Sequence, residues 1–100
     1  MNYVIKTTFI FAKWIKKVKD KSTLFRIQAR LSRLEQGNFG DCKAIEADLF
    51  ELRLFFSGGI RIYYTIQNEQ VVLLLCGGDK SSQQVDIAKA KKLLREVADE

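Results

Sequence analysis

Two arginines, a tyrosine, an aspartate and a lysine in the second half of the chain could act together on a phosphate group. These residues are Arg53, Arg61, Tyr63, Asp79 and Lys80. Because a guanidinium is planar and always charged, two of them on neighbouring strands can hold one phosphate through bidentate contacts. Lys80 adds a third cation with Asp79 beside it, and Tyr63 could stack on a nucleobase or bond to a phosphate oxygen. The set therefore predicts a phosphate-binding site.

A simpler interpretation stands beside this one. Arginines are common on the exposed face of a half-buried sheet. Gly77 and Gly78 would leave backbone amides open to an anion, but a glycine pair is more often only a turn. The sequence GGDK at residues 77–80 also lacks the spacing of a phosphate-binding P-loop. The residues alone leave both interpretations open.

The composition excludes several classes of enzyme. The 100 residues include no histidine and two cysteines, Cys42 and Cys76. The lack of histidine excludes Ser-His-Asp triads, Cys-His pairs and HExxH zinc sites. Two cysteines are too few for a disulfide scaffold or a four-ligand zinc site, so we expect free thiols, no metal and no cofactor. We also expect one domain spanning residues 1–100.

The hydropathy pattern gives no sign of a membrane segment. A transmembrane helix needs about 18 or more consecutive apolar residues, and the chain has no such stretch. The apolar run at residues 7–12 is shorter than the core of a signal peptide and lacks a small-residue cleavage site. We therefore expect a cytoplasmic protein.

Two strands and a glycine-rich turn must position the arginines. Residues 60–66 alternate, with Ile60 and Ile62 on one face and Arg61 and Tyr63 on the other. A three-residue loop at 57–59 pairs Arg53 with Tyr63 and keeps the two faces separate, whereas a two-residue loop mixes them. We therefore predict the three-residue loop, with both arginines and Tyr63 on one open face of the sheet.

The remaining segments predict an α+β fold. Strands are expected at residues 3–5, 42–45, 50–56, 60–66 and 71–76, the last buried on both faces and ended by the glycine pair. Three helices are indicated by apolar positions Phe11, Ile15 and Val18, then Leu24, Ile27, Leu31 and Leu34, then Ile87, Ala90, Leu94 and Val97. Their expected caps are Thr7 or Thr8, Ser22 or Thr23, and Ser81 or Ser82, with Gly37 ending the second helix. The order βααββββα predicts a mostly antiparallel sheet packed against an N-terminal helical hairpin and a C-terminal helix.

Positive charge is concentrated on that hairpin. Residues 1–36 contain nine basic and two acidic side chains, although the whole chain has a net charge of only +5. The candidate contacts are Arg26, Arg30 and Arg33, which form a stripe on the second helix, together with Lys13 and Lys17 on the first. The pattern is consistent with RNA or an acidic protein segment as partner, and equally with a solvated helix surface.

Five segments together resemble the RelE/ParE toxin superfamily, and most closely its HigB-like branch of phage-related addiction-module killer proteins. They are Arg33–Asp41, Glu51–Arg53, Gly59–Tyr64, Leu73–Ser81 and Asp86–Ala90, and the resemblance covers nearly the whole chain. It implies a microbial RNase-like fold and a toxin of a type II toxin–antitoxin system. Its partner would be a helix-turn-helix antitoxin.

The resemblance also implies an activity. Members of the superfamily typically cleave messenger RNA, often on the ribosome, and Arg53 and Arg61 match positions that hold the scissile phosphate. Lys80 falls in a segment that often supplies further catalytic groups, and Asp79, Glu51 and Tyr63 are the candidates for general acid and base. The alternatives are a non-nucleolytic inhibitor of DNA gyrase, as in the ParE arm, and an inactive interaction module with the toxin fold.

Overall fold

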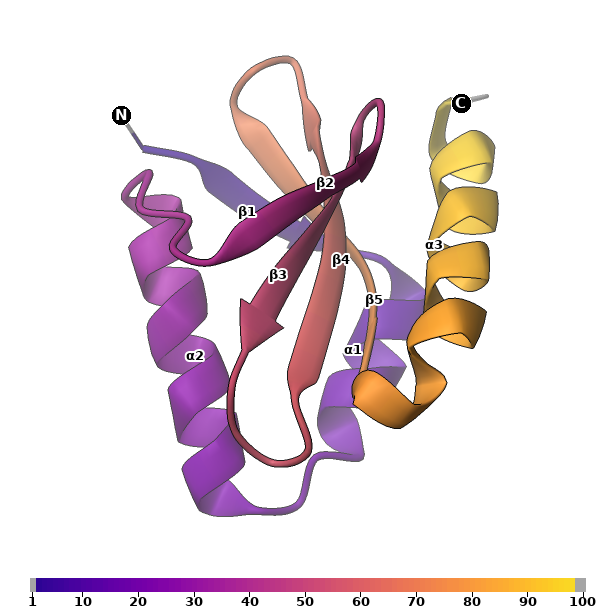
Figure 1. Cartoon of the computed structure of the whole chain (residues 1–100). Coiled ribbons are helices and arrows are strands. Elements are labelled where there is room, and N and C mark those ends of the chain that lie inside the picture. The colour runs from indigo at the N-terminus through magenta and orange to yellow at the C-terminus, as the bar shows by residue number, and fades with distance from the viewer. Residues whose placement is uncertain (1, 99–100) are drawn as a thin grey trace.

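The computed structural model describes residues 2–98, which form three helices and a five-stranded sheet (Figure 1). The strands are β1 (Val4–Thr7), β2 (Cys42–Glu46), β3 (Leu49–Leu54), β4 (Ile60–Gln67) and β5 (Val71–Gly78). The helices are α1 (Phe9–Lys16), α2 (Lys21–Glu35) and α3 (Gln83–Ala98), and a short 3-10 turn, η1 (Lys80–Ser82), precedes α3. The predicted α+β class and element order are confirmed.

The sheet has the strand order β1-β5-β4-β3-β2, and all but one of its pairings are antiparallel. The exception joins the first strand to the last, because β1 runs parallel to β5 with Val4 opposite Val71. The chain can make this parallel contact because α1, α2 and three strands lie between the two partners. The predicted mostly antiparallel sheet is therefore confirmed.

Helices cover both faces of the sheet (Figure 1). On one face α1 and α2 pack their apolar residues, including Phe11, Ile27 and Leu34, against Leu52 and Ile62. On the other face α3 contributes Ala90 to a second cluster of buried residues, whose other members are Leu49, Tyr63, Leu73, Leu75 and Cys76. The strand β5 is buried on both faces, as its continuous apolar sequence predicts.

The hairpin between β3 and β4 has the predicted faces but a different register. Arg53 lies opposite Arg61, and Leu54 lies opposite Ile60, so the loop comprises the five residues 55–59 instead of three. Its last three residues, Ser57, Gly58 and Gly59, all have positive φ angles, and the Gly59 N–H donates to the Phe56 carbonyl at 3.0 Å, so the chain turns inside the loop and the strands stop pairing at Leu54 and Ile60. The shift is by two positions in the pairing, which leaves every side chain on its predicted face.

One of the expected helix caps is wrong. Asp20 caps α2 in place of Ser22 or Thr23, because its carboxylate accepts hydrogen bonds from both the backbone N–H and the hydroxyl of Thr23. Asp79 caps η1, the short turn that leads into α3, and the cap predicted for α3 itself, Ser81 or Ser82, stays a prediction. Thr8 caps α1 and Gly37 has a φ of 87°, as predicted.

The glycine pair does not end β5 and does not present open amides. Gly77 and Gly78 continue the strand, where they pair with Ile62 and Arg61. A Cβ atom added to Gly77 would lie 2.6 Å from the Trp14 ring, and one added to Gly78 would collide with the Asp86 carboxylate. The two residues are glycines because helices α1 and α3 approach the strand closely there. The predicted anion approach to their amides is therefore wrong.

Candidate functional site

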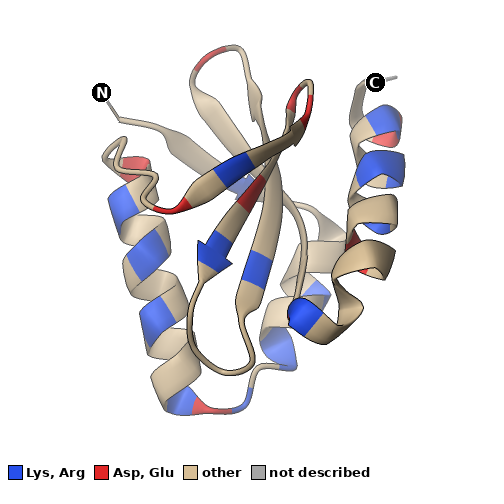
Figure 2. Ribbon diagram, viewed as in Figure 1, with Lys and Arg blue, Asp and Glu red and all other residues tan. Residues whose placement is uncertain are grey.

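Three cations from three different elements gather at one end of the sheet (Figure 2). Arg53 in β3 lies directly opposite Arg61 in β4. Lys80 begins η1, and its backbone N–H donates to the carbonyl of Gly58 in the β3–β4 loop at 3.3 Å. Gly59 lies between Arg61 and Lys80, since a Cβ atom on Gly59 would be 3.1 Å from an Arg61 nitrogen and 3.6 Å from the Lys80 Cβ. The structure thus brings Arg53, Arg61 and Lys80 together.

Arg61 is held in place by its neighbours. Its Nη1 donates to the Gly59 carbonyl at 2.8 Å, and its Nε lies 3.8 Å from a carboxylate oxygen of Glu51. Glu51 is only 1% exposed, and Gln83 at the start of α3 donates to the same oxygen at 2.9 Å. The Arg61 side chain is itself 13% exposed. A buried carboxylate therefore orients this guanidinium and balances part of its charge.

Arg53 is more accessible and pairs with a residue that the sequence did not single out. Its Nη2 donates to the Asp41 carboxylate at 2.8 Å. This hydrogen bond, together with the negative charge of Asp41, holds the pKa of Arg53 above its ordinary value. Asp41 stands just before β2, and only the pairing of β2 with β3 brings it beside Arg53. No local motif could have revealed it.

Tyr63 does not lie on an open face. Helix α3 covers that part of the sheet, so Tyr63 is fully buried and its hydroxyl has no hydrogen-bond partner among the described residues. Burial raises the pKa of the hydroxyl, and the negative charge of Glu51 raises it further. The expectation that Tyr63 stacks on a nucleobase is therefore wrong for this structure. Glu51, another candidate base, is buried in the same place.

Asp79 is the one exposed carboxylate among the predicted acid and base candidates in the part of the chain that the structure describes. It accepts hydrogen bonds from the backbone N–H and the hydroxyl of Ser81. These bonds lower the pKa of Asp79, and the nearby charge of Arg61 lowers it further. Asp79 is therefore ionised at neutral pH and able to accept a proton.

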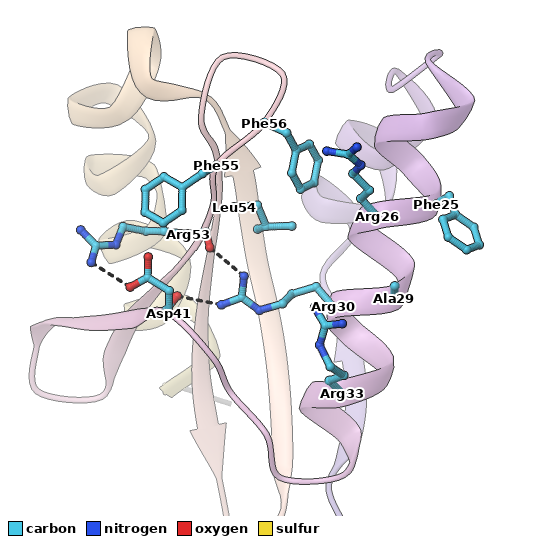
Figure 3. Close-up of a pocket in the computed structure, with 10 residues that line it drawn as sticks. All are labelled: Phe25, Arg26, Ala29, Arg30, Arg33, Asp41, Arg53, Leu54, Phe55 and Phe56. Carbon is cyan, nitrogen blue, oxygen red and sulfur yellow. Dashed lines mark hydrogen bonds and ion pairs between the residues drawn. The ribbon is translucent and has the colours of Figure 1, made fainter.

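The predicted arginine stripe on α2 is divided by burial. Arg30 is only 9% exposed and donates to the backbone carbonyls of Arg53 and Asp41 at 2.7 and 2.9 Å (Figure 3). It also donates to the carbonyl of Phe39 at 3.1 Å. Its burial lowers its pKa. Arg26 and Arg33 are exposed, and Arg26 lies over the Phe56 ring at 5.2 Å. The expectation that Arg30 contacts a partner is wrong in this structure, because its guanidinium fastens α2 to the sheet.

Arg26 and Arg33 line a cleft of about 280 Å³ between α2 and the end of β3 (Figure 3). Arg53 and Asp41 form part of its wall. Lys13 and Lys17 do not reach this cleft; they line a second one, of about 180 Å³, together with Trp14, Gly77 and Lys89. The five basic contacts predicted as one surface therefore belong to separate places.

The described residues, 2–98, contain no group of three acidic or cysteine side chains placed to hold a metal ion. Within the same residues no helix has the length and apolar character needed to cross a membrane. Cys42 and Cys76 are both free thiols, the first exposed and the second buried.

Comparison with known proteins gives both a family and a fold. Residues 13–97 match the family described as phage derived protein Gp49-like. An uncharacterized protein of Haemophilus influenzae is 46% identical over 97 residues, which are 97% of this chain and 98% of that protein.

Among solved structures, the fold is similar to that of a mutant of the Escherichia coli toxin RelE in the free state. The TM-score is 0.73 at 19% identity, over 92% of this chain and 97% of that one. RelE in complex with a peptide of its antitoxin RelB gives a TM-score of 0.65 at 18% identity, over 88% and 94% of the two chains. The intact E. coli RelBE toxin–antitoxin complex gives 0.60 at 20% identity, over 77% and 95%.

Proposed function

The chain belongs to the phage-derived Gp49-like family, and from this premise we propose that it is the toxin of a type II toxin–antitoxin pair. The fold supports the proposal because RelE, a toxin, shares it over nearly the whole chain. RelE also binds an antitoxin in its solved complexes. By the same reasoning we propose a helix-turn-helix antitoxin as the partner and the cytoplasm as the compartment.

The proposed activity is cleavage of messenger RNA on the ribosome. The observation that carries it is the convergence of Arg53, Arg61 and Lys80 at one end of the sheet. In such a reaction the 2′-hydroxyl of the RNA loses its proton and attacks the adjacent phosphorus, and the 5′-oxygen leaves and takes a proton from water. The products are a 2′,3′-cyclic phosphate and a free 5′-hydroxyl. The non-bridging oxygens on the phosphorus gain negative charge in the transition state, and preorganised cations stabilise that charge.

The chain's own residues suit this reaction without histidine. Arg61, fixed by Glu51 and Gly59, is the phosphate clamp, and the more exposed Arg53 and Lys80 complete it. Asp79 is the proposed acceptor of the 2′-hydroxyl proton, because it is ionised and lies beside Lys80 in the chain. A carboxylate with a lowered pKa is a weak base, so most of the acceleration comes from positioning and charge stabilisation.

Induction of the protein without its antitoxin tests the proposal. We expect growth arrest and RNA ends that map within translated codons. Arg61→Ala should relieve the arrest, whereas Arg95→Ala should not, because Arg95 is an exposed arginine on α3 outside the proposed site. Circular dichroism checks that both variants fold. A double variant, Arg53→Ala with Arg61→Ala, that folds and remains fully toxic would show that the site assignment is wrong.

Inhibition of DNA gyrase without nucleolysis is the second candidate. The burial of Glu51 and Tyr63 favours it, because two of the three candidate bases then lie out of reach of a substrate. Intact transcripts together with DNA damage after induction would establish this function in place of RNA cleavage. No growth phenotype at all would leave an inactive interaction module with the toxin fold.

A further inference from the structure

The cleft between α2 and β3 adjoins the proposed phosphate site. Arg53 belongs to both, since it lies opposite Arg61 at the end of the sheet and also lines the cleft. A strand of RNA held at Arg53 and Arg61 must continue in one direction or the other from the scissile phosphate. The cleft is the hollow next to Arg53, with a volume of about 280 Å³.

Exposed aromatic rings stand on both sides of this cleft. Phe55 follows β3 directly and is 78% exposed, and Phe25 on α2 is also exposed (Figure 3). Phe56 is different, because its ring is partly buried and lies under the Arg26 guanidinium. Leaving a phenylalanine ring in water gains nothing for folding, so two exposed rings at one cleft indicate a ligand with flat apolar faces.

The charge of the cleft restricts the ligand further. Its lining includes the four arginines Arg26, Arg30, Arg33 and Arg53 and a single acidic residue, Asp41. The carboxylate of Asp41 is occupied by Arg53, and Arg30 is occupied by backbone carbonyls. Arg26 and Arg33 therefore remain to meet an anion. Proteins that bind single-stranded nucleic acids combine cations with exposed aromatic rings. The cations contact the phosphate backbone, and the rings stack on the faces of the bases.

We propose that this cleft binds the nucleotide next to the scissile phosphate, with the base against Phe55 and the following phosphate at Arg33. The inference rests on the proposed function, because it assumes an RNA substrate at Arg53 and Arg61. It adds a separate subsite that makes base contacts, whereas the three cations at the end of the sheet contact only phosphate. Phe55 is then a determinant of RNA affinity and takes no part in the chemical step.

The test is a titration of the purified protein with a 2′-O-methylated RNA trinucleotide, which cannot be cleaved because its 2′-hydroxyls are blocked. Backbone amide signals followed by NMR should shift at Phe25, Ala29 and Phe55. Phe55→Ala should weaken binding about tenfold, within the range measured for the loss of one base–aromatic stack. Phe9→Ala is the matched control, because Phe9 is equally exposed but lines a different cleft beside α1.

A second pair of variants tests the phosphate contact. Arg33→Gln should lower the slope of log affinity against log salt by about 0.7, the value for one phosphate contact on a single strand. Arg95→Gln, an equal change of charge on α3, should leave the slope unchanged. If the backbone amide signals of the cleft residues do not shift in the titration, the inference is wrong, and the cleft would instead be a binding site for a protein partner. The proposed function is judged separately, by growth arrest and RNA-end mapping, so the two can fail independently.

Discussion

Arg30 offers the sharpest test of how the helices are attached to the sheet. Its guanidinium donates to three backbone carbonyls in two segments, at Arg53 in β3 and at Phe39 and Asp41 before β2. The change Arg30→Met keeps most of the apolar stem and removes every donor. The three carbonyls then lose their bonds in a place that is mostly shielded from water.

The expected loss follows from these bonds. A hydrogen bond from a charged donor contributes about 1.5 to 3 kcal/mol, so three at the low end give about 4.5 kcal/mol. Burial of the charged guanidinium offsets part of this stabilisation, and the same burial lowers the pKa of Arg30. We therefore expect Arg30→Met to reduce the free energy of unfolding by about 2 to 4 kcal/mol. Arg30→Lys should recover less than half of the loss, because one ammonium cannot span both segments.

Urea denaturation measures this change, with the m value checked for constancy. Arg33→Met is the matched control on the same helix. The positive charge of Arg33 lowers the pKa of Arg30, so removing it should leave stability unchanged or slightly increased. If Arg30→Met unfolds within about 0.5 kcal/mol of the wild type, the scale of an ordinary surface substitution, the guanidinium is not a structural fastener and the reasoning fails.

Three further predictions concern other parts of the chain. Burial raises the pKa of Cys76 to about 12. At pH 8 a thiol reagent should therefore label the exposed Cys42 within minutes and the buried Cys76 only on unfolding. Rapid labelling of both thiols in the native protein would contradict this. Gly77→Ala should lower the free energy of unfolding by about 1 to 3 kcal/mol and shift the Trp14 fluorescence maximum, since the new methyl group meets the indole ring. An unchanged emission spectrum would argue against that contact. Glu51→Gln should destabilise the protein by about 3 kcal/mol and weaken binding of the RNA trinucleotide, because Arg61 loses the buried carboxylate that orients it. Unchanged or tighter binding would show that Glu51 does not orient the guanidinium.

The alternation of side chains predicted the faces of the central strands well. Residues 60–66 were assigned correctly to two faces, because a period of two depends only on burial and not on the loop. The loop itself was too short in the prediction, since the register can move by two positions without changing any face. Arg53 therefore lies opposite Arg61 and not opposite Tyr63.

Errors in the candidate site came from contacts distant in sequence. Arg30 has the spacing of an exposed stripe residue, and only the arrival of Phe39 and Asp41 beside α2 buries it. Tyr63 lies on the predicted face of β4, but α3 covers that face along most of its length and leaves only the end near Arg61 open. Local pattern shows which side of a strand a residue occupies, but not which helix later packs there.

The parallel pairing of β1 with β5 has a consequence for how the chain folds during synthesis. Thr8 donates its hydroxyl proton to the carbonyl of Leu75, a contact that spans 67 residues of sequence. The first strand therefore stays unpaired until residues 71–75 of β5 have left the ribosome. Contacts of such long range slow folding, because the chain loses loop entropy before it gains the contact. The nascent chain should thus complete its sheet only after β5 has emerged from the ribosome, and the edge of β1 stays open to other contacts until then.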